Sequence, residues 1–259
     1  MQVAILQTDI FWEDPQANYD HLCRKIKNIS GVDLIVLPEM FTTGFSMNAP
    51  RIAEEHEGNT LKWMIGMAKE KQSTITGSIV IQEKEQYFNR LYWVNKNGQY
   101  HSYDKRHLFR MAKEDQYYQY GNNRLIVLQE DFRFCPMICY DLRFPVWSRN
   151  INQHQQPAYD CLIYVANWPE ARTDAWTSLL KARAIENQAY VIGVNRIGTD
   201  YNKIAYSGAS RVFDPKGVRL DSFKENTESV EIISLDKKIL NDFRETFPIT
   251  LDADRFKII

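Results

Sequence analysis

The chain has 259 residues, of which 44% are hydrophobic, enough to form the core of one large domain. Its 32 Lys and Arg residues nearly balance 33 Asp and Glu residues, so the formal net charge is −1. This balance lacks the basic excess that attracts nucleic acid or an anionic membrane, and we expect neither as a partner. No apolar run is long enough to predict a transmembrane helix, and Met1–Ile5 has no basic segment typical of a secretory signal, so we expect a cytoplasmic protein.

Strand-like apolar runs alternate with amphipathic helical stretches in the first half of the chain. Residues 2–8 predict a strand, and Asp14 with Pro15 predicts the start of a helix, because Asp caps helices and Pro suits their first turn. The run 34–37, closed by Pro38, is typical of a central strand buried on both faces. A second helix is expected over 60–71, followed by strands near 74–82, 89–95 and 99–104.

The second half repeats this alternation without a linker or a low-complexity stretch. A helix is expected over 171–187, because Trp176, Leu180 and Ala184 share one of its faces. Asp214-Pro-Lys-Gly predicts a turn between two β segments. Strands are expected near 124–128, 133–139, 160–166, 189–195 and 229–235. Residues 1–259 are therefore predicted to form one mixed α/β domain.

Three reactive side chains each come just after a predicted strand. Glu39 follows Leu-Ile-Val-Leu-Pro, Lys105 follows Gln-Tyr-His-Ser-Tyr-Asp, and Cys139 ends the run Phe-Arg-Phe-Cys-Pro-Met-Ile. Loops that leave buried strands are where α/β proteins build their sites. We therefore consider these three residues as candidates for one active site.

A cysteine nucleophile needs a base, because a free thiol has a pKa of about 8.5. Glu39 is the stronger candidate, since burial behind an apolar run raises a carboxylate pKa and makes it a usable base near neutrality. His107 is an alternative partner for Cys139; among the other histidines, His21 lies on a predicted helix and His154 in a polar stretch.

Lys105 suits the remaining need of acyl transfer, a positive charge beside the developing oxyanion. Each of these residues also has an ordinary interpretation. Cys139 could be a buried structural cysteine, Glu39 a loop carboxylate bonded to backbone N–H groups, and Lys105 a solvated cation.

Taken together, the motifs resemble the nitrilase superfamily of carbon-nitrogen hydrolases. The matching stretches are LIVLPE at 34–39, YDKRHLF at 103–109 and ICYDLRFP at 138–145, in the order of the family, with further matches at 166–169 and 183–188. The short loop between Lys105 and Glu114 is similar to the bacterial ω-amidase branch. Several motifs of this length in the same order are specific for a family, whereas any single motif is weak evidence.

The resemblance implies an α/β fold, a four-layer α-β-β-α sandwich of the nitrilase type, and a catalytic set of Glu39, Lys105 and Cys139. It also implies a second glutamate, Glu114, for which Asp115 is the neighbouring competitor. The implied reaction is hydrolysis of the terminal amide of a small 2-oxo acid ω-amide through a cysteine thioester. Neither a metal nor another cofactor is implied, and the implied assembly is a homodimer.

Four residues are predicted to bind the substrate. The backbone N–H of Tyr140 follows the nucleophile and can stabilise the oxyanion, and Asn167 belongs to one of the matching stretches. Arg143 is the first candidate for the carboxylate of a small oxo-acid amide, with Arg172 and Lys113 as alternatives.

Two other functions remain open at this stage. One is a nitrilase-superfamily amidase for another substrate, such as an N-carbamoyl compound or deaminated glutathione. The other is a non-catalytic binding protein that has kept the fold.

Overall fold

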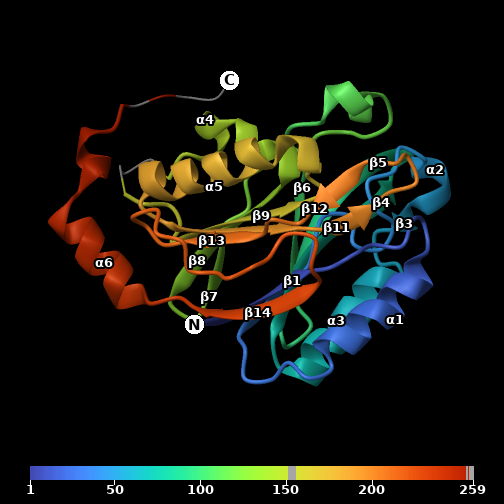
Figure 1. Ribbon diagram of the computed structural model, residues 1–259, viewed down its shortest axis with the longest axis horizontal. Coiled ribbons are helices and arrows are strands. Elements are labelled where there is room, and N and C mark those ends of the chain that lie inside the picture. The colour runs from blue at the N-terminus through green and yellow to red at the C-terminus, as the bar shows by residue number, and fades with distance from the viewer. Residues whose placement is uncertain (151–155, 255, 257–259) are drawn as a thin grey trace.

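The structure is a computed structural model that describes residues 1–150, 156–254 and 256. Within these residues, two large β-sheets lie face to face and helices cover their outer faces (Figure 1). This arrangement confirms the predicted α/β fold of four layers, helix, sheet, sheet and helix. None of the helices in the described parts of the chain has the length and apolar composition needed to span a membrane.

The first sheet has seven strands in the described chain, in the order β14-β1-β2-β4-β5-β6 with β3 beside β4. Its central strands β1, β2 and β4 are parallel, while β14, β5 and β6 join antiparallel. Their bounds are β1 (Gln2–Gln7), β2 (Leu34–Val36), β3 (Glu54–Glu55), β4 (Thr74–Glu83), β5 (Gln86–Val94), β6 (Tyr100–Asp104) and β14 (Ser229–Ser234).

The second sheet has five strands within the described residues, in the order β13-β10-β9-β8-β7, with β8, β9 and β10 parallel. A separate two-stranded hairpin, β11 with β12, follows β10 in the chain. The bounds are β7 (Val127–Gln129), β8 (Phe132–Ile138), β9 (Cys161–Ala166), β10 (Tyr190–Asn195), β11 (Ile197–Thr199), β12 (Ala205–Ser207) and β13 (Arg211–Phe213).

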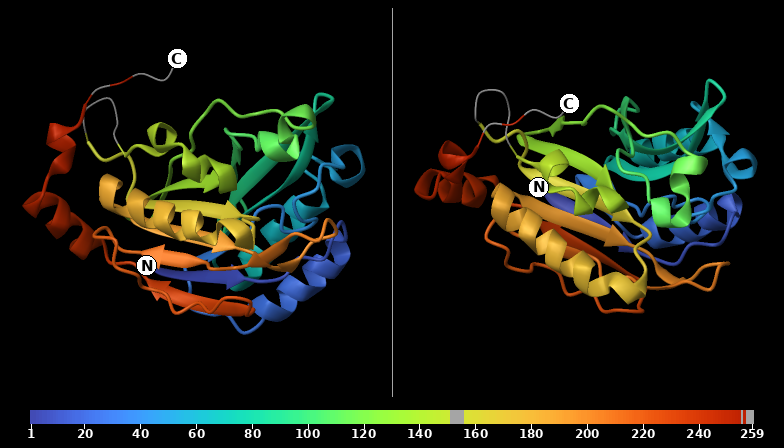
Figure 2. Two further views of the ribbon diagram at one scale, coloured as in Figure 1. Left: turned by 45° about the horizontal axis from the view of Figure 1, so that its top comes forward. Right: turned by 90° about the horizontal axis from the view of Figure 1, so that it is seen from above.

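The longer helices α1 and α3 cover the first sheet, and α5 covers the second (Figure 1). In the turned views, α6 lies at the opposite end of the sheets from α1 (Figure 2). The α-helices are α1 (Pro15–Ile26), α2 (Ala49–Ile52), α3 (Asn59–Lys71), α4 (Pro145–Ser148), α5 (Thr173–Asn187) and α6 (Lys237–Thr246). Short 3₁₀ helices are η1 (Arg110–Ala112), η2 (Glu114–Gln116), η3 (Cys139–Arg143), η4 (Glu170–Arg172) and η5 (Ile249–Asp252).

Alternating side chains of β1 and β2 build two separate core layers. Val3 and Val36 point between the two sheets, whereas Ala4 and Ile35 pack with the buried faces of α1 and α3. Because successive residues of a strand face opposite sides, a strand that is apolar throughout suits a sheet covered on both faces. The structure thus confirms the predicted doubly buried strand as β2, which lies in the sheet interior and ends at Val36, one residue before the end of the predicted run.

Most predicted elements are present, with shifted ends. The Asp14 side chain accepts a hydrogen bond from the Ala17 N–H at 3.0 Å, which confirms the predicted helix cap. The strand expected near 124–128 starts later, at Val127, and the helix expected over 171–187 becomes α-helical only at Thr173, after a 3₁₀ turn. Helix α6 was not predicted from the sequence; Leu240 is its one buried residue.

Candidate active site

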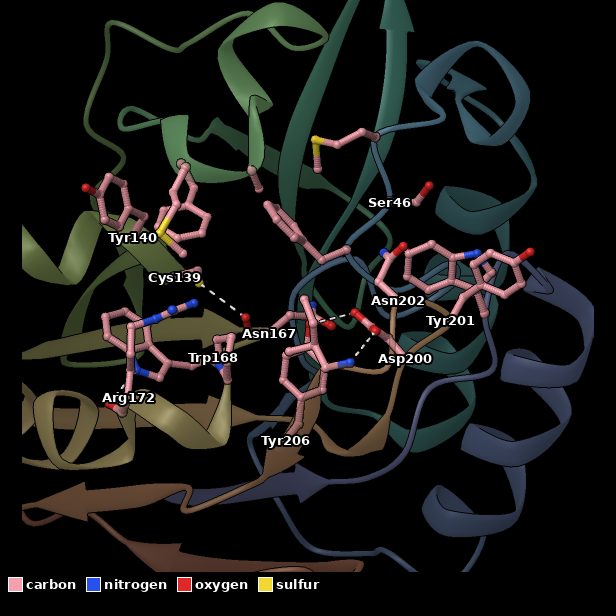
Figure 3. Close-up of a pocket in the computed structure, with 18 of the residues that line it drawn as sticks. Ser46, Cys139, Tyr140, Asn167, Trp168, Arg172, Asp200, Tyr201, Asn202 and Tyr206 are labelled. Atoms are coloured by element: carbon pink, nitrogen blue, oxygen red, sulfur yellow. Dashed lines mark hydrogen bonds between the residues drawn. The ribbon is translucent and has the colours of Figure 1, made fainter.

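The candidate catalytic residues converge from both sheets. Glu39 lies three residues after β2 and Lys105 directly after β6, both in the first sheet, whereas Cys139 directly follows β8 of the second. Lys105 and Cys139 line a cavity of about 940 Å³, shown around Cys139 in Figure 3. Glu39 and Glu114 are fully buried behind that surface.

Lys105 is held between two carboxylates. Its Nζ lies 2.9 Å from Oε1 of Glu39 and 3.0 Å from each carboxylate oxygen of Glu114, and none of the three side chains is exposed. Burial opposes the charge of Lys105, but the carboxylates of Glu114 and Glu39 outweigh it and raise the lysine pKa above its usual range. The lysine therefore stays protonated, as an oxyanion ligand must.

The carboxylate of Glu39 is fixed by three donors. Oε1 accepts from Nδ2 of Asn89 at 2.8 Å as well as from Lys105, and Oε2 accepts the backbone N–H of Asn167 at 2.8 Å. The Asn167 side chain also donates to the backbone carbonyl of Glu39 at 2.6 Å. These bonds fix the orientation of the carboxylate.

The thiol of Cys139 is protonated in the resting site. Burial and the neighbouring Glu39 carboxylate raise the Cys139 pKa well above its usual range, and Lys105 only partly opposes them. The Cys139 Sγ lies 3.9 Å from the backbone carbonyl of Asn167. The nucleophile therefore needs a base at the moment of attack, and the neighbouring Glu39 carboxylate is the candidate.

Burial also controls Glu114, whose pKa is raised above the usual range of a glutamate. Removal from water and the charge of Glu39 raise it, while Lys105 and the backbone N–H of Phe109, 2.5 Å from Oε2, act in the opposite direction. Glu114 thus fixes the loop after Lys105 as well as the ammonium itself.

The backbone is strained at the nucleophile. Cys139 has a φ of 45°, and Met40, directly after Glu39, has a φ of 43°. Left-handed conformations are unfavourable for residues with a side chain and persist where the surrounding structure imposes them, often at active sites. Cys139 is the first residue of η3, and Tyr140 is the second. The backbone N–H groups in the first turn of a helix have no partner within the helix, so the Tyr140 N–H is free to bind an outside acceptor.

Of the three arginines that line the cavity in the described residues, Arg51 pairs with Glu13, whereas Arg143 and Arg172 contact aromatic rings. The Arg143 guanidinium lies 5.0 Å above the ring of Trp168, and the Arg172 guanidinium lies 5.3 Å above the ring of Phe109. In the described residues, neither guanidinium forms a salt bridge with a carboxylate. Aromatic rings hold both cations in place without neutralising them.

The structure brings all eight predicted site residues together. Tyr140, Arg143, Asn167 and Arg172 line the same cavity as Cys139 and Lys105, with Glu39 and Glu114 directly behind. Tyr140, Asn167 and Arg172 are labelled around Cys139 in Figure 3. Their contribution to catalysis or binding stays a prediction at this point.

The geometry excludes three of the alternatives. Nδ1 of His107 bonds to Asp141 at 2.8 Å and its ring stacks on Phe144 at 3.7 Å, so it is no partner for Cys139. Asp115, the competitor of Glu114, is exposed, and Lys113 is exposed and does not line the cavity. His154 lies outside the described residues.

Several residues at the site were not predicted from the sequence. Asn89 is fully buried in β5 and bonds to Glu39. The sequence feature that could have indicated it is an Asn inside a predicted strand, where this residue type is uncommon. Hairpin β11–β12 brings Tyr201 and Tyr206 to the cavity wall, and Tyr201 stacks on Trp12 with ring centroids 6.1 Å apart. No local pattern predicted that this hairpin would reach the nucleophile.

Cys139 differs from the other three cysteines in its exposure to the cavity. Cys135 and Cys161 are sealed in the core and Cys23 is half-buried, whereas Cys139 is 9% exposed and faces the cavity. Across residues 1–150, 156–254 and 256, no group of three or more His, Cys, Asp or Glu side chains is arranged to hold a metal ion.

Comparisons with known proteins agree with this geometry. The chain is 43% identical over 258 residues to the omega-amidase YafV of Escherichia coli (strain K12), covering 100% of this chain and 98% of the relative. It is 31% identical over 251 residues to the 2-oxoglutaramate amidase of Bacillus subtilis (strain 168), covering 95% of each. A solved CN-hydrolase superfamily protein from Xanthomonas campestris superposes with a TM-score of 0.97 at 39% identity, covering 100% of this chain and 99% of that one.

The family itself follows from the match along nearly the whole chain. The sequence model of the carbon-nitrogen hydrolase family covers residues 2–245, which include both sheets and all four buried or cavity-lining catalytic candidates. The chain belongs to the carbon-nitrogen hydrolase family of the nitrilase superfamily and is a hydrolase of amide carbon–nitrogen bonds.

Proposed function

We propose that this protein is an ω-amidase, which hydrolyses the terminal amide of small 2-oxo acid ω-amides such as 2-oxoglutaramate and 2-oxosuccinamate to the acid and ammonia. The single observation that carries the proposal is a cavity that combines a thiol, backed by the buried Glu39–Lys105–Glu114 cluster, with two unneutralised guanidinium groups. The names of the relatives from Escherichia coli and Bacillus subtilis support the same substrate class.

In the first half-reaction, Glu39 takes the thiol proton of Cys139 and the sulfur attacks the amide carbon. The carbonyl oxygen becomes an oxyanion, which the Lys105 ammonium and the Tyr140 backbone N–H stabilise. Glu39 then returns the proton to the amide nitrogen, the carbon–nitrogen bond breaks, and ammonia leaves behind a thioester on Cys139.

In the second half-reaction, water replaces ammonia in the same position. Glu39 removes a proton from that water, which attacks the thioester carbon, and Lys105 again stabilises the oxyanion. The carbon–sulfur bond breaks and the thiolate of Cys139 recovers the proton, releasing the acid. Glu114 assists by holding Lys105 in place and charged, through contacts of 3.0 Å.

A free acceptor beside the nucleophile suits a primary amide. Asn167 lines the cavity, and its Oδ1 is buried without a hydrogen-bond partner in the described residues. An unpaired buried acceptor is unfavourable, and an N–H of the substrate amide relieves that cost. We assign Asn167 this contact in addition to its bonds to Glu39.

The far end of the substrate carries a carboxylate, which needs a cation if it is to leave water. Arg143 follows Cys139 by four residues, on the same 3₁₀ turn, and Arg172 lines the same cavity from η4. A guanidinium binds a carboxylate through two parallel N–H donors. We propose Arg143 as the primary carboxylate ligand and Arg172 as the second.

Ammonia release from a panel of amides tests this substrate. We expect 2-oxoglutaramate and 2-oxosuccinamate to exceed glutamine, asparagine, an N-carbamoyl amino acid, deaminated glutathione and a nitrile in kcat/KM. A higher kcat/KM for the carbamoyl compound or for deaminated glutathione would assign the chain to another branch of the family.

The reactivity of the cysteines tests the non-catalytic alternative. A binding protein of this fold would need no reactive thiol. We expect iodoacetamide to alkylate Cys139 far faster than Cys23, Cys135 or Cys161, because Glu39 takes the thiol proton as the sulfur attacks. Mass spectrometry locates the modified residue. Equal and slow alkylation of all four would favour a binding protein.

We further propose that residues 1–259 act as one catalytic domain, that the enzyme assembles as a homodimer and that it works in the cytoplasm, as the resemblance to the family implies. Light scattering on the purified protein would measure the mass of the assembly against the 30.5 kDa of one chain. Cell fractionation would test the location.

A further inference from the structure

Asp141 is a buried carboxylate beside the nucleophile that the mechanism above does not use. Its Oδ2 accepts the Tyr103 hydroxyl at 2.6 Å and the Ile138 N–H at 3.1 Å. Its Oδ1 accepts the backbone N–H of His107 at 2.9 Å and lies 2.8 Å from Nδ1 of that ring. Because a carboxylate oxygen only accepts, Nδ1 carries the proton in this contact. Four donors therefore converge on one side chain.

These donors come from both sheets, and they lie next to Cys139 in one sheet and next to Lys105 in the other. Ile138 ends β8 and directly precedes Cys139, the second-sheet contribution to the site. Tyr103 and His107 lie two residues before and two residues after Lys105, the first-sheet contribution. One carboxylate thus connects the turn of the nucleophile to the turn of the lysine.

The relative position of Cys139 and Lys105, which this connection joins, strongly affects the reaction. Cys139 is strained at a φ of 45°, and such a conformation persists only when its surroundings hold it. Lys105 must be within hydrogen-bond distance of an oxygen whose position depends on Cys139, and a misplacement of about 1 Å can cost a reaction about 10²-fold.

We propose that Asp141 is a positioning residue of the reaction, which sets Lys105 against the turn of Cys139 across the two sheets without touching the substrate. The proposal rests on the amidase chemistry proposed above. It also gives His107 a role, as a donor to Asp141 rather than as a base.

Tyr103→Phe is the first variant that tests this role. It removes the 2.6 Å bond to Asp141, together with the bonds that the hydroxyl accepts from Nε1 of Trp147 at 3.1 Å and from the Arg106 N–H at 3.3 Å. It keeps the ring in the core, where Tyr103 is 2% exposed. We expect kcat to fall about tenfold while KM stays within about twofold, because substrate contacts are untouched and transition-state contacts are loosened. Alkylation of Cys139 should also slow, since Lys105 lowers the thiol pKa and a displaced Lys105 does so less.

Tyr92→Phe is the matched control. Tyr92 is equally buried on the neighbouring strand β5, and its hydroxyl donates to the backbone carbonyl of His56 at 2.8 Å, away from the cavity. It loses the same hydroxyl from the same sheet. We expect a similar fall in melting temperature for both variants, with kcat and alkylation rate unchanged in Tyr92→Phe.

Asp141→Asn tests the carboxylate itself. It keeps the shape but turns one acceptor oxygen into a donor that faces N–H or O–H groups, so we expect a fall in kcat of about 10²-fold, larger than for Tyr103→Phe. If Asp141→Asn does not fold, Tyr103→Phe and His107→Ala still test the proposal, because each removes one donor to Asp141.

The proposal is overturned if folded Tyr103→Phe and His107→Ala match Tyr92→Phe in both kcat and alkylation rate. A wild-type enzyme inactive on ω-amides would instead overturn the proposed substrate. In that case the ratio of variant to wild-type kcat is measured on the amide that the enzyme does hydrolyse, and the alkylation rates need no substrate.

Discussion

Two buried ionic clusters in this protein balance their charges in opposite ways. In the active site, the single ammonium of Lys105 faces two carboxylates, Glu39 and Glu114. Around Asp160, just before β9, a single fully buried carboxylate contacts three cations. These cations are Arg133 at 2.8 Å, Lys237 at 2.5 Å and Arg244 at 2.7 Å.

The two clusters shift carboxylate pKa values in opposite directions. Burial raises the pKa of Glu114, and the one lysine does not compensate for it. Burial acts the same way on Asp160, but its hydrogen bonds to Arg133 and Lys237 outweigh it and hold that pKa well below the usual range. The active-site cluster has more carboxylates than cations, so it can accept a proton. The Asp160 cluster has more cations than carboxylates, so Asp160 stays ionised and its ion pairs link β8, β9 and α6.

Removing the nucleophile should break the catalytic cluster most completely. We expect Cys139→Ser to lower kcat by at least about 10³-fold, because a serine hydroxyl is far less acidic than a thiol and a carboxylate activates it poorly. Steady-state ammonia release measures the loss, and circular dichroism checks the fold. Retention of more than about a tenth of the activity would rule out Cys139 as the nucleophile.

Changing the charge balance of the same cluster should have the next largest effect. We expect Lys105→Ala to lower kcat by about 10²–10³-fold, the usual cost of deleting an oxyanion donor. Glu39→Gln should lower kcat strongly as well, since an amide cannot take the thiol proton. An increase in KM alone for Lys105→Ala would instead make the lysine a substrate clamp.

Arg143→Met tests the cationic wall of the cavity, where the effect should be on binding. We expect KM for 2-oxoglutaramate to rise by at least about tenfold, because the substrate carboxylate would be buried without its partner. A neutral amide of similar length should lose much less. Equal losses for both substrates would indicate a structural Arg143 and favour Arg172 as the carboxylate ligand.

Asp160→Asn should separate the two clusters, because it changes stability and leaves catalysis alone. We expect a loss of about 2–4 kcal/mol in unfolding free energy, less than for a fully sealed pair since Arg133 is 37% exposed, with kcat unchanged. Urea unfolding measures the first quantity and ammonia release the second. A fall in kcat in proportion to stability would mean that the clusters are coupled.

The same variant has a defined dependence on pH. The folded pKa of Asp160 lies below its ordinary value of 3.8, so its stabilisation is fully present above that value and disappears as the pH falls toward the folded pKa. We therefore expect the stability difference between wild type and Asp160→Asn to be constant near neutrality and to shrink below about pH 4. A difference that grew in acid would contradict the low pKa of Asp160.

Local patterns were sufficient for the secondary structure near the site and for choosing its candidate reactive residues. The apolar run 34–37 is typical of a strand covered on both faces, and Glu39, Lys105 and Cys139 each come just after a predicted strand. The ordered motifs then predicted the family, and they contain five of the predicted residues in the cavity wall: Lys105, Cys139, Tyr140, Arg143 and Asn167. These features depend on neighbours in the chain, through backbone periodicity, helix caps and turn residues.

Those patterns did not predict contacts between segments that are distant in the chain. Asn89 on Glu39, Asp141 between two sheets, and the stacking of Tyr201 on Trp12 each join residues that lie far apart in the chain. The sequence also left open whether Cys139 would use Glu39 or His107. Packing of the two sheets decided it, by sealing Glu39 against Lys105 and turning His107 toward Asp141. Burial and charge pairing, which set pKa values, arise only when separate segments exclude water from one another.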